Sequence, residues 1–341
     1  MATIRDIAKK AGVSVGTVSN YLNNSDKLAE KTRVKISDAI KEVGYYPNVA
    51  ARSLKSNLTR RIGIVPLVYS DEEYTTNASD AAFQEFLSAV NMAAAKNDYS
   101  LLMHASVDEK DELEIYRQML GQGQVDGILV LGTMPNDKRV KFLMDKKFPF
   151  VSYGRTNIMG HNSWVDVDGA FGMKSAVQTL ADLGHRKIAW AAPTNDLSCY
   201  YDRRRGYIEG LEKNNITVNE NYIIKSGFRE KDGQISMHQL VDIVDPPTAV
   251  IMANDLASFG AMSALSKRGL EVGKDISVIG FDDIIASEHW TPSLTTVRQP
   301  TRRVGIKAVE MLIDIIGGKD VEEYIFRPEV VRRASTGQCK I

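Results

Sequence analysis

Apolar side chains recur at helical spacing over residues 3–22 and predict two short helices joined by a tight turn. Thr3 and Ser14 are residues that cap helix starts, and Gly12 between the two segments can adopt the left-handed conformation that ends a helix. Two helices joined by a glycine-containing turn are typical of the helix-turn-helix, whose second helix enters the major groove of DNA. An ordinary helical hairpin is the alternative that the pattern leaves open.

The pattern continues with a third helix over residues 28–43, whose apolar positions complete a small core. A turn at Pro47 follows, and Asn48 can cap a short helix over residues 49–55. A helix this short is marginal alone in water, so the segment is a candidate for ordering on binding. Leu54 in this segment either inserts between base steps in the minor groove or packs against the rest of the chain.

From residue 61 onwards, short apolar runs alternate with helical patterns in two successive sets, which predicts parallel sheets covered by helices on both faces. Two α/β lobes in series favour a ligand site between them, beyond the carboxyl ends of the strands. The expected strands span residues 62–65, 100–103, 127–131, 150–152, 187–191, 222–224, 249–252 and 277–281. The expected helices span residues 81–95, 109–120, 138–146, 177–183, 203–214, 235–241 and 257–268.

The balance of basic and acidic residues changes sign at the same boundary, near residue 60. The whole chain is formally neutral, but residues 1–60 hold 11 Lys and Arg against 5 Asp and Glu, and the remainder holds 32 against 38. A basic head on an acidic body fits a head that contacts phosphate. A merely solvated charged face does not explain why the sign changes at one boundary.

The composition excludes several classes of protein. With 341 residues, 43% of them hydrophobic and 25% charged, the chain is typical of a globular protein of two or three domains. Cys199 and Cys339 have no metal-binding or redox spacing, so no metal and no other cofactor is expected. No apolar run approaches the roughly 18 residues of a membrane span, and early charges interrupt any signal-peptide pattern. We therefore expect a cytoplasmic protein with reduced thiols and no membrane association.

Stretches along nearly the whole chain resemble the lactose-repressor (LacI/GalR) family of bacterial transcription regulators. They are TIRDIAKKAGVSVGTVSNYLN, KTRVKISDAIKEVGYYPNVAARSLKS, ADLGHRKIAW, VIMANDLASFGAMSAL, DISVIGFDD and TPSLTTVRQP, in the family's order. The resemblance implies an α/β fold with a three-helix helix-turn-helix head, a hinge helix, and a two-lobed parallel-sheet body like the periplasmic sugar-binding proteins. It also implies a repressor that binds a palindromic double-stranded operator as a homodimer.

Carried over by position, the resemblance places the base-reading residues of the second helix at Val15, Gly16 and Asn20. The Asn20 amide can hydrogen-bond an adenine edge at two points, Val15 offers only an apolar contact, and Gly16 has no side chain. Many relatives carry longer polar side chains at positions 15 and 16, so this head is expected to read fewer base edges directly. The remaining expected DNA-binding residues are Thr3, Ser14, Thr17 and Ser19 in the head and Ala51, Leu54 and Lys55 in the hinge, with Leu54 at the intercalating position.

The resemblance further implies a small effector, a sugar or sugar derivative, held between the lobes by Arg203, Asn254 and Asp282. An Arg, an amide and a carboxylate suit vicinal hydroxyls, because each can make two hydrogen bonds at once. Phe228 aligns with a family aromatic that can lie against a sugar face, and Arg155 is a further candidate. Other roles stay open at two positions: Arg203 lies in a run of three arginines that could be a surface charge, and Asp282 could cap a helix or form an ion pair.

Two departures from the family pattern affect the N-terminal half of the effector site. Gly154 stands where many members have an acidic residue after the fourth strand, and residues 69–80 form a long polar loop in place of the commoner Asn-Pro-Phe-Phe pattern. No particular sugar is therefore assigned. The chain ends without leucine heptads, which favours a dimer over a tetramer.

The expected domains follow from the same reading. They are a DNA-binding head at residues 1–46, a hinge helix and linker at 47–60, and an effector-binding and dimerisation domain at 61–341, with an N-lobe of about 61–160 and 292–322 and a C-lobe of about 161–291 and 323–341.

Two other functions, an enzyme and a transport-type binding protein, fit the sequence less well. Residues 12–16 match the G-x-S-x-G nucleophile elbow of hydrolases, but that elbow follows a sheet strand, and here a helix is expected before it. Gly121 and Gly123 precede a strand instead of following one, and no acid–base pair has glycosidase spacing, so no catalytic residue is expected. A transport-type binding protein without a DNA role is disfavoured by the basic head.

Overall fold

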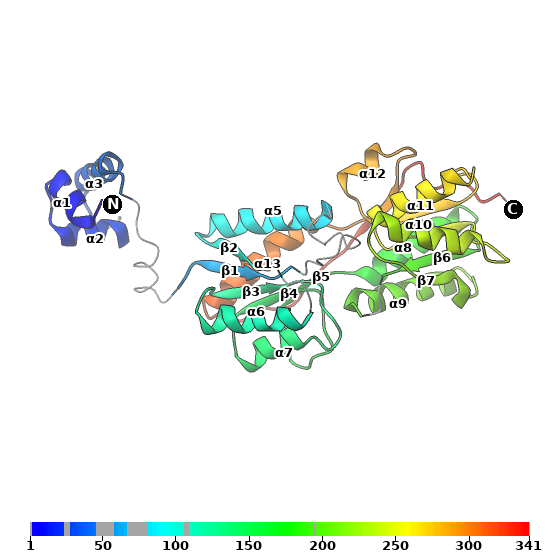
Figure 1. Cartoon of the computed structure of the whole chain (residues 1–341), viewed down its shortest axis with the longest axis horizontal. Helices are drawn as coiled ribbons and strands as arrows, with labels where there is room; N and C mark the ends of the chain where they lie inside the picture. The colour runs from blue at the N-terminus through cyan, green and yellow to red at the C-terminus, as the bar shows by residue number, and fades with distance from the viewer. Residues whose placement is uncertain are drawn as a thin grey trace. The chain divides into compact units, whose positions relative to one another are not determined.

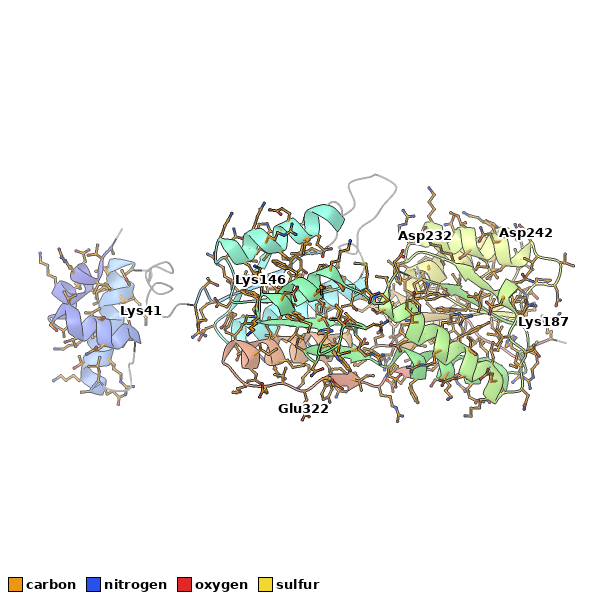
Figure 2. The ribbon with its side chains drawn as sticks, turned by 90° about the horizontal axis from the view of Figure 1, so that it is seen from below. Lys41, Lys146, Lys187, Asp232, Asp242 and Glu322 are labelled. Carbon is orange, nitrogen blue, oxygen red and sulfur yellow. The ribbon has the colours of Figure 1, made fainter. Side chains whose placement is uncertain are left out.

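The structure is a computed structural model that describes residues 2–23, 28–45, 58–66, 81–105, 109–193 and 196–340. The chain divides into two compact units, Met1–Thr59 and Arg60–Ile341, which we call the head and the body (Figure 1). Charged side chains such as Lys41 of the head and Lys146, Lys187 and Glu322 of the body are exposed at the surface (Figure 2).

The head contains three helices, α1 (Ile4–Ala11), α2 (Val15–Asn23) and α3 (Glu30–Val43). Thr3 and Asp6 form a reciprocal capping box at the start of α1, and Gly12 ends α1 with a left-handed φ of 66°. These local signals were predicted from the sequence and are confirmed. The three helices enclose a core of Ile7, Ala8, Val18, Ile36 and Ala39. Burial of these five side chains fixes the angle between α1 and α2.

The first lobe of the body, the N-lobe, is a six-stranded parallel sheet with the order β11-β5-β4-β3-β1-β2. Its apolar strands are buried on both faces, with α5 and α13 over one face and α6 and α7 over the other (Figure 1). The strands are β1 (Arg61–Ile64), β2 (Ser100–Met103), β3 (Gly127–Val130), β4 (Phe150–Tyr153), β5 (Trp164–Val167) and β11 (Tyr324–Phe326). The helices are α5 (Ala81–Lys96), α6 (Glu109–Gly121), α7 (Lys138–Asp145) and α13 (Thr301–Ile316).

The second lobe, the C-lobe, repeats this plan with the order β12-β10-β9-β8-β6-β7, in which only the pairing of β12 with β10 is antiparallel. Helices α8 and α9 cover one face, and α10 and α11 cover the other. The strands are β6 (Ile188–Ala192), β7 (Ile223–Lys225), β8 (Ala249–Ile251), β9 (Ser277–Asp282), β10 (Thr295–Arg298) and β12 (Glu329–Val331). The helices are α8 (Gly169–Asp182), α9 (Ser198–Lys213), the 3-10 turn η3 (Glu220–Tyr222), α10 (Glu230–Val241), α11 (Asp255–Lys267) and α12 (Ile285–His289).

The chain crosses between the lobes three times: between β5 and α8, between β10 and α13, and between β11 and β12. These crossings lie several residues beyond the boundaries expected near residues 160, 291 and 322. The differences arise because β5 and β11 pair within the N-lobe sheet and β10 pairs within the C-lobe sheet, and none of these three short strands was predicted. These three crossings matter for function because any change in lobe angle must pass through them.

Candidate functional site

The exposed face of α2 carries the residues expected to read DNA. Val15, Gly16 and Asn20 are exposed, whereas Val18 on the opposite face is fully buried in the head core. Val15 keeps 47% of its surface exposed, which leaves it available to a partner. The structure therefore places the expected base-reading residues together on one surface of one helix.

Short side chains at the start of α2 hold this helix in place. The Ser14 hydroxyl accepts a 3.0 Å hydrogen bond from the Thr17 N–H and lies 2.8 Å from the Thr17 hydroxyl. Ser14 is thus a helix cap between two helices, and no strand precedes it, so residues 12–16 do not form a nucleophile elbow. The Thr3 hydroxyl is likewise engaged with Asp6. Ala51, Leu54 and Lys55 of the expected hinge lie outside the described residues, as does the expected helix over residues 49–55.

In the body, the expected effector contacts lie past the carboxyl ends of the C-lobe strands. Asp282 ends β9, Asn254 follows β8, and Arg203 lies on α9 after β6. Arg203 was expected to open its helix, which is wrong: α9 begins five residues earlier at Ser198, so Arg203 lies in its second turn. Phe228 is half-buried between β7 and α10.

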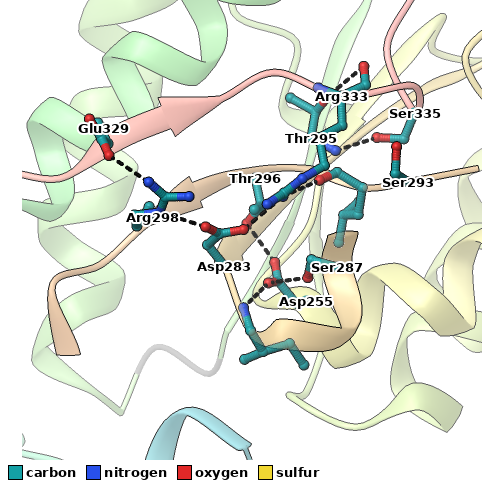
Figure 3. Close-up of polar contacts among 12 residues, drawn as sticks. Asp255, Asp283, Ser287, Ser293, Thr295, Thr296, Arg298, Glu329, Arg333 and Ser335 are labelled. Carbon is teal, nitrogen blue, oxygen red and sulfur yellow. Dashed lines mark hydrogen bonds and ion pairs between the residues drawn. The ribbon is translucent and has the colours of Figure 1, made fainter. Parts of the chain in front are cut away.

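Asp282 is held by an unusual loop. Its φ is 123° and that of Asp283 is 62°, a backbone conformation that L-residues adopt only under constraint. The constraint comes from the Asp283 carboxylate, which pairs with Arg298 at 2.6 Å and with Arg333 at 2.7 Å (Figure 3). These ion pairs fasten the loop to β10 and to the segment after β12. Asp283, beside Asp282, forms both of these ion pairs.

A buried carboxylate fixes the other side of this loop. Asp255 accepts hydrogen bonds from the Ile284 N–H at 2.9 Å, the Ser287 hydroxyl at 2.7 Å and the Thr296 hydroxyl at 2.5 Å (Figure 3). Burial raises the pKa of Asp255 to about 6, and the three donors oppose that rise. A Cβ at Gly280 would lie 2.2 Å from the Asp255 carboxylate, so the strand passes close to this side chain because it carries glycine there.

Arg203 and Asn254 are almost completely buried, with 7% and 2% of their surface exposed. Nη1 of Arg203 donates a 2.7 Å hydrogen bond to the Ala253 carbonyl, and its guanidinium lies 3.6 Å from the centre of the Phe281 ring. Oδ1 of Asn254 caps α11 by accepting from the Ala257 N–H. The Asn254 Nδ2 has no hydrogen-bond partner within the described part of the chain. The burial of Arg203 excludes the surface-charge alternative.

Several contacts join the lobes at the start of α9. The Ser198 N–H donates to the Thr133 carbonyl of the N-lobe at 2.9 Å. Arg155, from the loop after β4, pairs with Asp166 of its own lobe at 2.9 Å and with Asp202 of α9. The guanidinium of Arg155, expected as an effector contact, is thereby engaged by two protein carboxylates.

Three residues near this junction were missed by sequence reasoning. Burial raises the pKa of Tyr153, and the carboxylates of Asp166 and Asp282 raise it further, which places these groups from both lobes near one another. Burial also raises the pKa of the Cys199 thiol, on α9 one turn before Arg203. Residues four apart lie on the same face of a helix, so the spacing to Arg203 could have identified Cys199 from the sequence. Gln299 lies in the segment that crosses from β10 to α13, and no local pattern in the sequence distinguishes it.

Two hollows of the body lie away from these residues. Hollows of about 320 Å³ and 590 Å³ each lie within a single lobe, against Phe148 and His161 and against Ile216 and Tyr222 respectively. Within the described ranges, no group of His, Cys, Asp and Glu side chains has the arrangement of a metal site. Among the helices that the structure describes, none combines the length and the apolar character needed to cross a membrane.

Comparison with known families gives two matches within the chain. Residues 3–48 match the family of bacterial regulatory proteins of the lacI type, and residues 177–336 match the periplasmic binding protein-like domain. The HTH-type transcriptional repressor PurR of Serratia proteamaculans (strain 568) is 34% identical over 339 residues, which cover 98% of this chain and 97% of that protein. PurR of Vibrio atlanticus (strain LGP32) is 34% identical over 338 residues, with 98% of each chain covered.

Solved structures give the same picture. The complex of the transcriptional regulator CelR with cellobiose has a TM-score of 0.74 and 28% identity, covering 98% of this chain and all of that chain. The lac repressor dimer bound to operator and the anti-inducer ONPF has a TM-score of 0.84 and 25% identity, covering 98% of this chain and 99% of that one. The likeness therefore includes head and body together.

Proposed function

Because this chain belongs to the LacI family of bacterial regulatory proteins and is an effector-controlled DNA-binding repressor, we propose that its effector is a carbohydrate bound between the two lobes. Arg203, Asn254 and Asp282 would bind the sugar hydroxyls, and Phe228 would lie against the sugar ring. The parallel-sheet lobes bring the first three of these side chains to the same edge of one sheet.

The observation that carries this proposal is the buried Asn254 amide, whose Nδ2 has no partner among the described residues. A buried donor without a partner costs about 1–3 kcal/mol, so the site is stabilised by any ligand that brings a hydroxyl acceptor to it. The Ser198 hydroxyl, on the same helix as Arg203, is also buried without a partner in the described part of the body. A ligand with several hydroxyls can satisfy both groups. The structural neighbour CelR, described in complex with cellobiose, supports a saccharide as the ligand class.

The DNA-binding side of the proposal uses the head and the hinge. We assign base contacts to Val15, Gly16 and Asn20, and minor-groove insertion to Leu54. The chain would act as a homodimer on a palindromic operator, as the lac repressor dimer does on its own operator. The remaining proposed DNA contacts are Thr3, Ser14, Thr17, Ser19, Ala51 and Lys55. The proposed domain limits are residues 1–46, 47–60 and 61–341.

A thermal-shift and calorimetric titration of the full chain tests the effector class. The panel contains cellobiose, glucose and galactose, with purine bases as planar ligands of another class. We expect a saccharide to raise Tm, and we expect Arg203→Lys to weaken its binding at least tenfold, because the Lys ammonium lacks the planar fork of the guanidinium. Arg204→Lys is the matched control, since Arg204 is the next residue of α9 and pairs with Glu220 of η3. Binding of a purine base with no binding of any saccharide would contradict the proposal.

A further inference from the structure

We propose that the effector carries no anionic group: it is an unphosphorylated saccharide, and sugar phosphates are rejected. This inference rests on the proposed carbohydrate site and names the class of carbohydrate that fits it. It follows from five charged side chains where the lobes meet, which we call the junction charges. They are Arg155, Arg203, Asp166, Asp202 and Asp282.

One of the two cations of this set, Arg155, has little capacity left for a phosphate. Arg155 is paired with Asp166 and Asp202 at once, and its ion pair with Asp202 joins the N-lobe to the C-lobe. Arg203 directs Nη1 to the Ala253 carbonyl and stacks on Phe281. Phosphate recognition by arginine depends on a free, two-pronged guanidinium edge. The Nε–Nη2 edge of Arg155 is taken by its two aspartates, which leaves Arg203 as the junction cation that a ligand can engage.

The carboxylates outnumber the cations. With all five groups ionised, the junction charges are three aspartates against two arginines, or one net negative charge, in a region where Arg203 is buried and the other four side chains are half-buried. Burial raises the pKa of the Cys199 thiol, Arg203 lowers it, and Asp166, Asp202 and Asp282 raise it, so the thiol lies close to four of the five junction charges. A dianionic phosphate entering the same region would be repelled at short range.

At each nearby helix N-terminus, the other common kind of anion-binding group, one N–H is already bonded within the chain. The Asp168 carboxylate accepts from the Phe171 N–H at the start of α8. The Asn254 side chain accepts from the Ala257 N–H at the start of α11. At the start of α9, the Ser198 N–H donates to Thr133. Anion binding at a helix terminus needs free N–H groups that point at the ligand, and these three are taken.

The amino-acid sequence supplies no additional cation from the segments outside the described residues of the body. Residues 67–80 contain four acidic residues and no Lys or Arg, and residues 106–108 and 194–195 contain no Lys or Arg. Every Lys and Arg of residues 61–341 apart from Lys110 therefore has a side chain that the structure describes. Arg298 and Arg333, near Asp282, are both paired with Asp283.

Matched pairs of ligands test this inference on the full chain. We would measure Kd by calorimetry for glucose, galactose and cellobiose and for the 6-phosphate of each. The expected result is that the neutral member of a pair binds at least tenfold more tightly than its phosphate. Equal or tighter binding of a phosphate would overturn the inference while leaving the carbohydrate site standing. If neither member of any pair bound, the proposed function itself would fail, and the inference would fall with it.

A charge-altering variant tests whether electrostatic repulsion is the reason that sugar phosphates are rejected. Asp202→Asn removes one of the two carboxylates that engage Arg155 and changes the net junction charge from negative to neutral. The expected result is that the ratio of phosphate to neutral affinity rises at least fivefold. Asp182→Asn, an exposed aspartate of α8 that pairs with Arg332, is the control and should leave that ratio unchanged. An unchanged ratio in Asp202→Asn would overturn the electrostatic explanation, and the unliganded Tm of each variant verifies that it is folded.

Discussion

The side-chain amide of Gln299 donates a 2.6 Å hydrogen bond to the carboxylate of Asp282. Gln299 lies in the segment that leads from β10 of the C-lobe to α13 of the N-lobe, and its Oε1 accepts a long, 3.5 Å hydrogen bond from the Tyr153 hydroxyl of the N-lobe. A ligand that binds Asp282 therefore acts on a carboxylate already bonded to a lobe crossing. We expect effector binding to change the angle between the lobes through this segment and, in a dimer, the spacing of the two hinges.

Gln299→Leu should uncouple the two functions. Leucine keeps a similar volume but cannot donate to Asp282, and a hydrogen bond to a charged group contributes about 1.5–3 kcal/mol. We expect the effector-induced change in operator affinity to shrink about tenfold, measured by fluorescence anisotropy with and without saccharide. Gln122→Leu, on an exposed turn of the N-lobe, is the control. An undiminished effector response in Gln299→Leu would remove this residue from the coupling.

Asp255→Asn should change how stability depends on pH. The pKa of Asp255 is raised from its ordinary value of 3.8 to about 6 in the folded chain, so the folded state holds this proton more tightly than the unfolded state. That stabilising contribution is complete below the unfolded pKa and is lost as the pH rises through the folded value. We therefore expect the free energy of unfolding of the variant, relative to wild type, to increase between pH 5 and pH 7. Denaturant titrations at several pH values measure it, and a difference independent of pH would contradict the assignment.

The contact between α10 and α11 should not tolerate a methyl group. A Cβ at Gly260 would lie 1.8 Å from the Glu230 carbonyl, and a Cβ at Gly233 would lie 1.8 Å from the Ala257 carbonyl. Because both obstacles are backbone, the helices must separate. We expect Gly260→Ala to lower the free energy of unfolding by about 1–3 kcal/mol or more. Gly121→Ala, with nothing within 4 Å of the added methyl, is the control and should be close to neutral. Equal effects of the two substitutions would refute this packing argument.

In the head, Asn20→Ala should weaken binding to a specific duplex more than binding to random DNA. Asn20 is exposed on α2, and a good two-point base contact contributes about 1–3 kcal/mol of discrimination. Anisotropy on a duplex selected in vitro and on a scrambled duplex measures the two losses. Asn221→Ala in the body, also exposed, provides the comparison. Equal losses on both duplexes would assign Asn20 to phosphate contact instead of base reading.

The sequence was sufficient where structure is determined locally. Thr3, Gly12 and Ser14 mark the helix ends of the head because capping involves residues only three or four positions apart. The buried parallel strands of the body were also predicted, since each is a continuous apolar run between turn residues.

The sequence was insufficient where distant contacts decide the structure. The expected starts of α8, α9 and α10 are wrong by five to eight residues. In α8 and α10 the first turn contains glycine, which weakens the helical signal. In α8 the structure offsets this weakness by packing: a Cβ at Gly169 or Gly172 would crowd Arg203 or Val297. Likewise, the pairing of Arg155 with Asp202 joins residues from different lobes, so only the fold reveals that Arg155 is engaged.

Reciprocal titration of the full chain tests the central account most directly. Operator Kd is measured with and without saturating saccharide, and saccharide Kd is measured with and without operator, on the same selected duplex. We predict that each ligand changes the affinity of the other by the same factor, of about fivefold or more, because coupling between two sites is reciprocal. A saccharide that binds the body and leaves operator affinity unchanged would contradict the account.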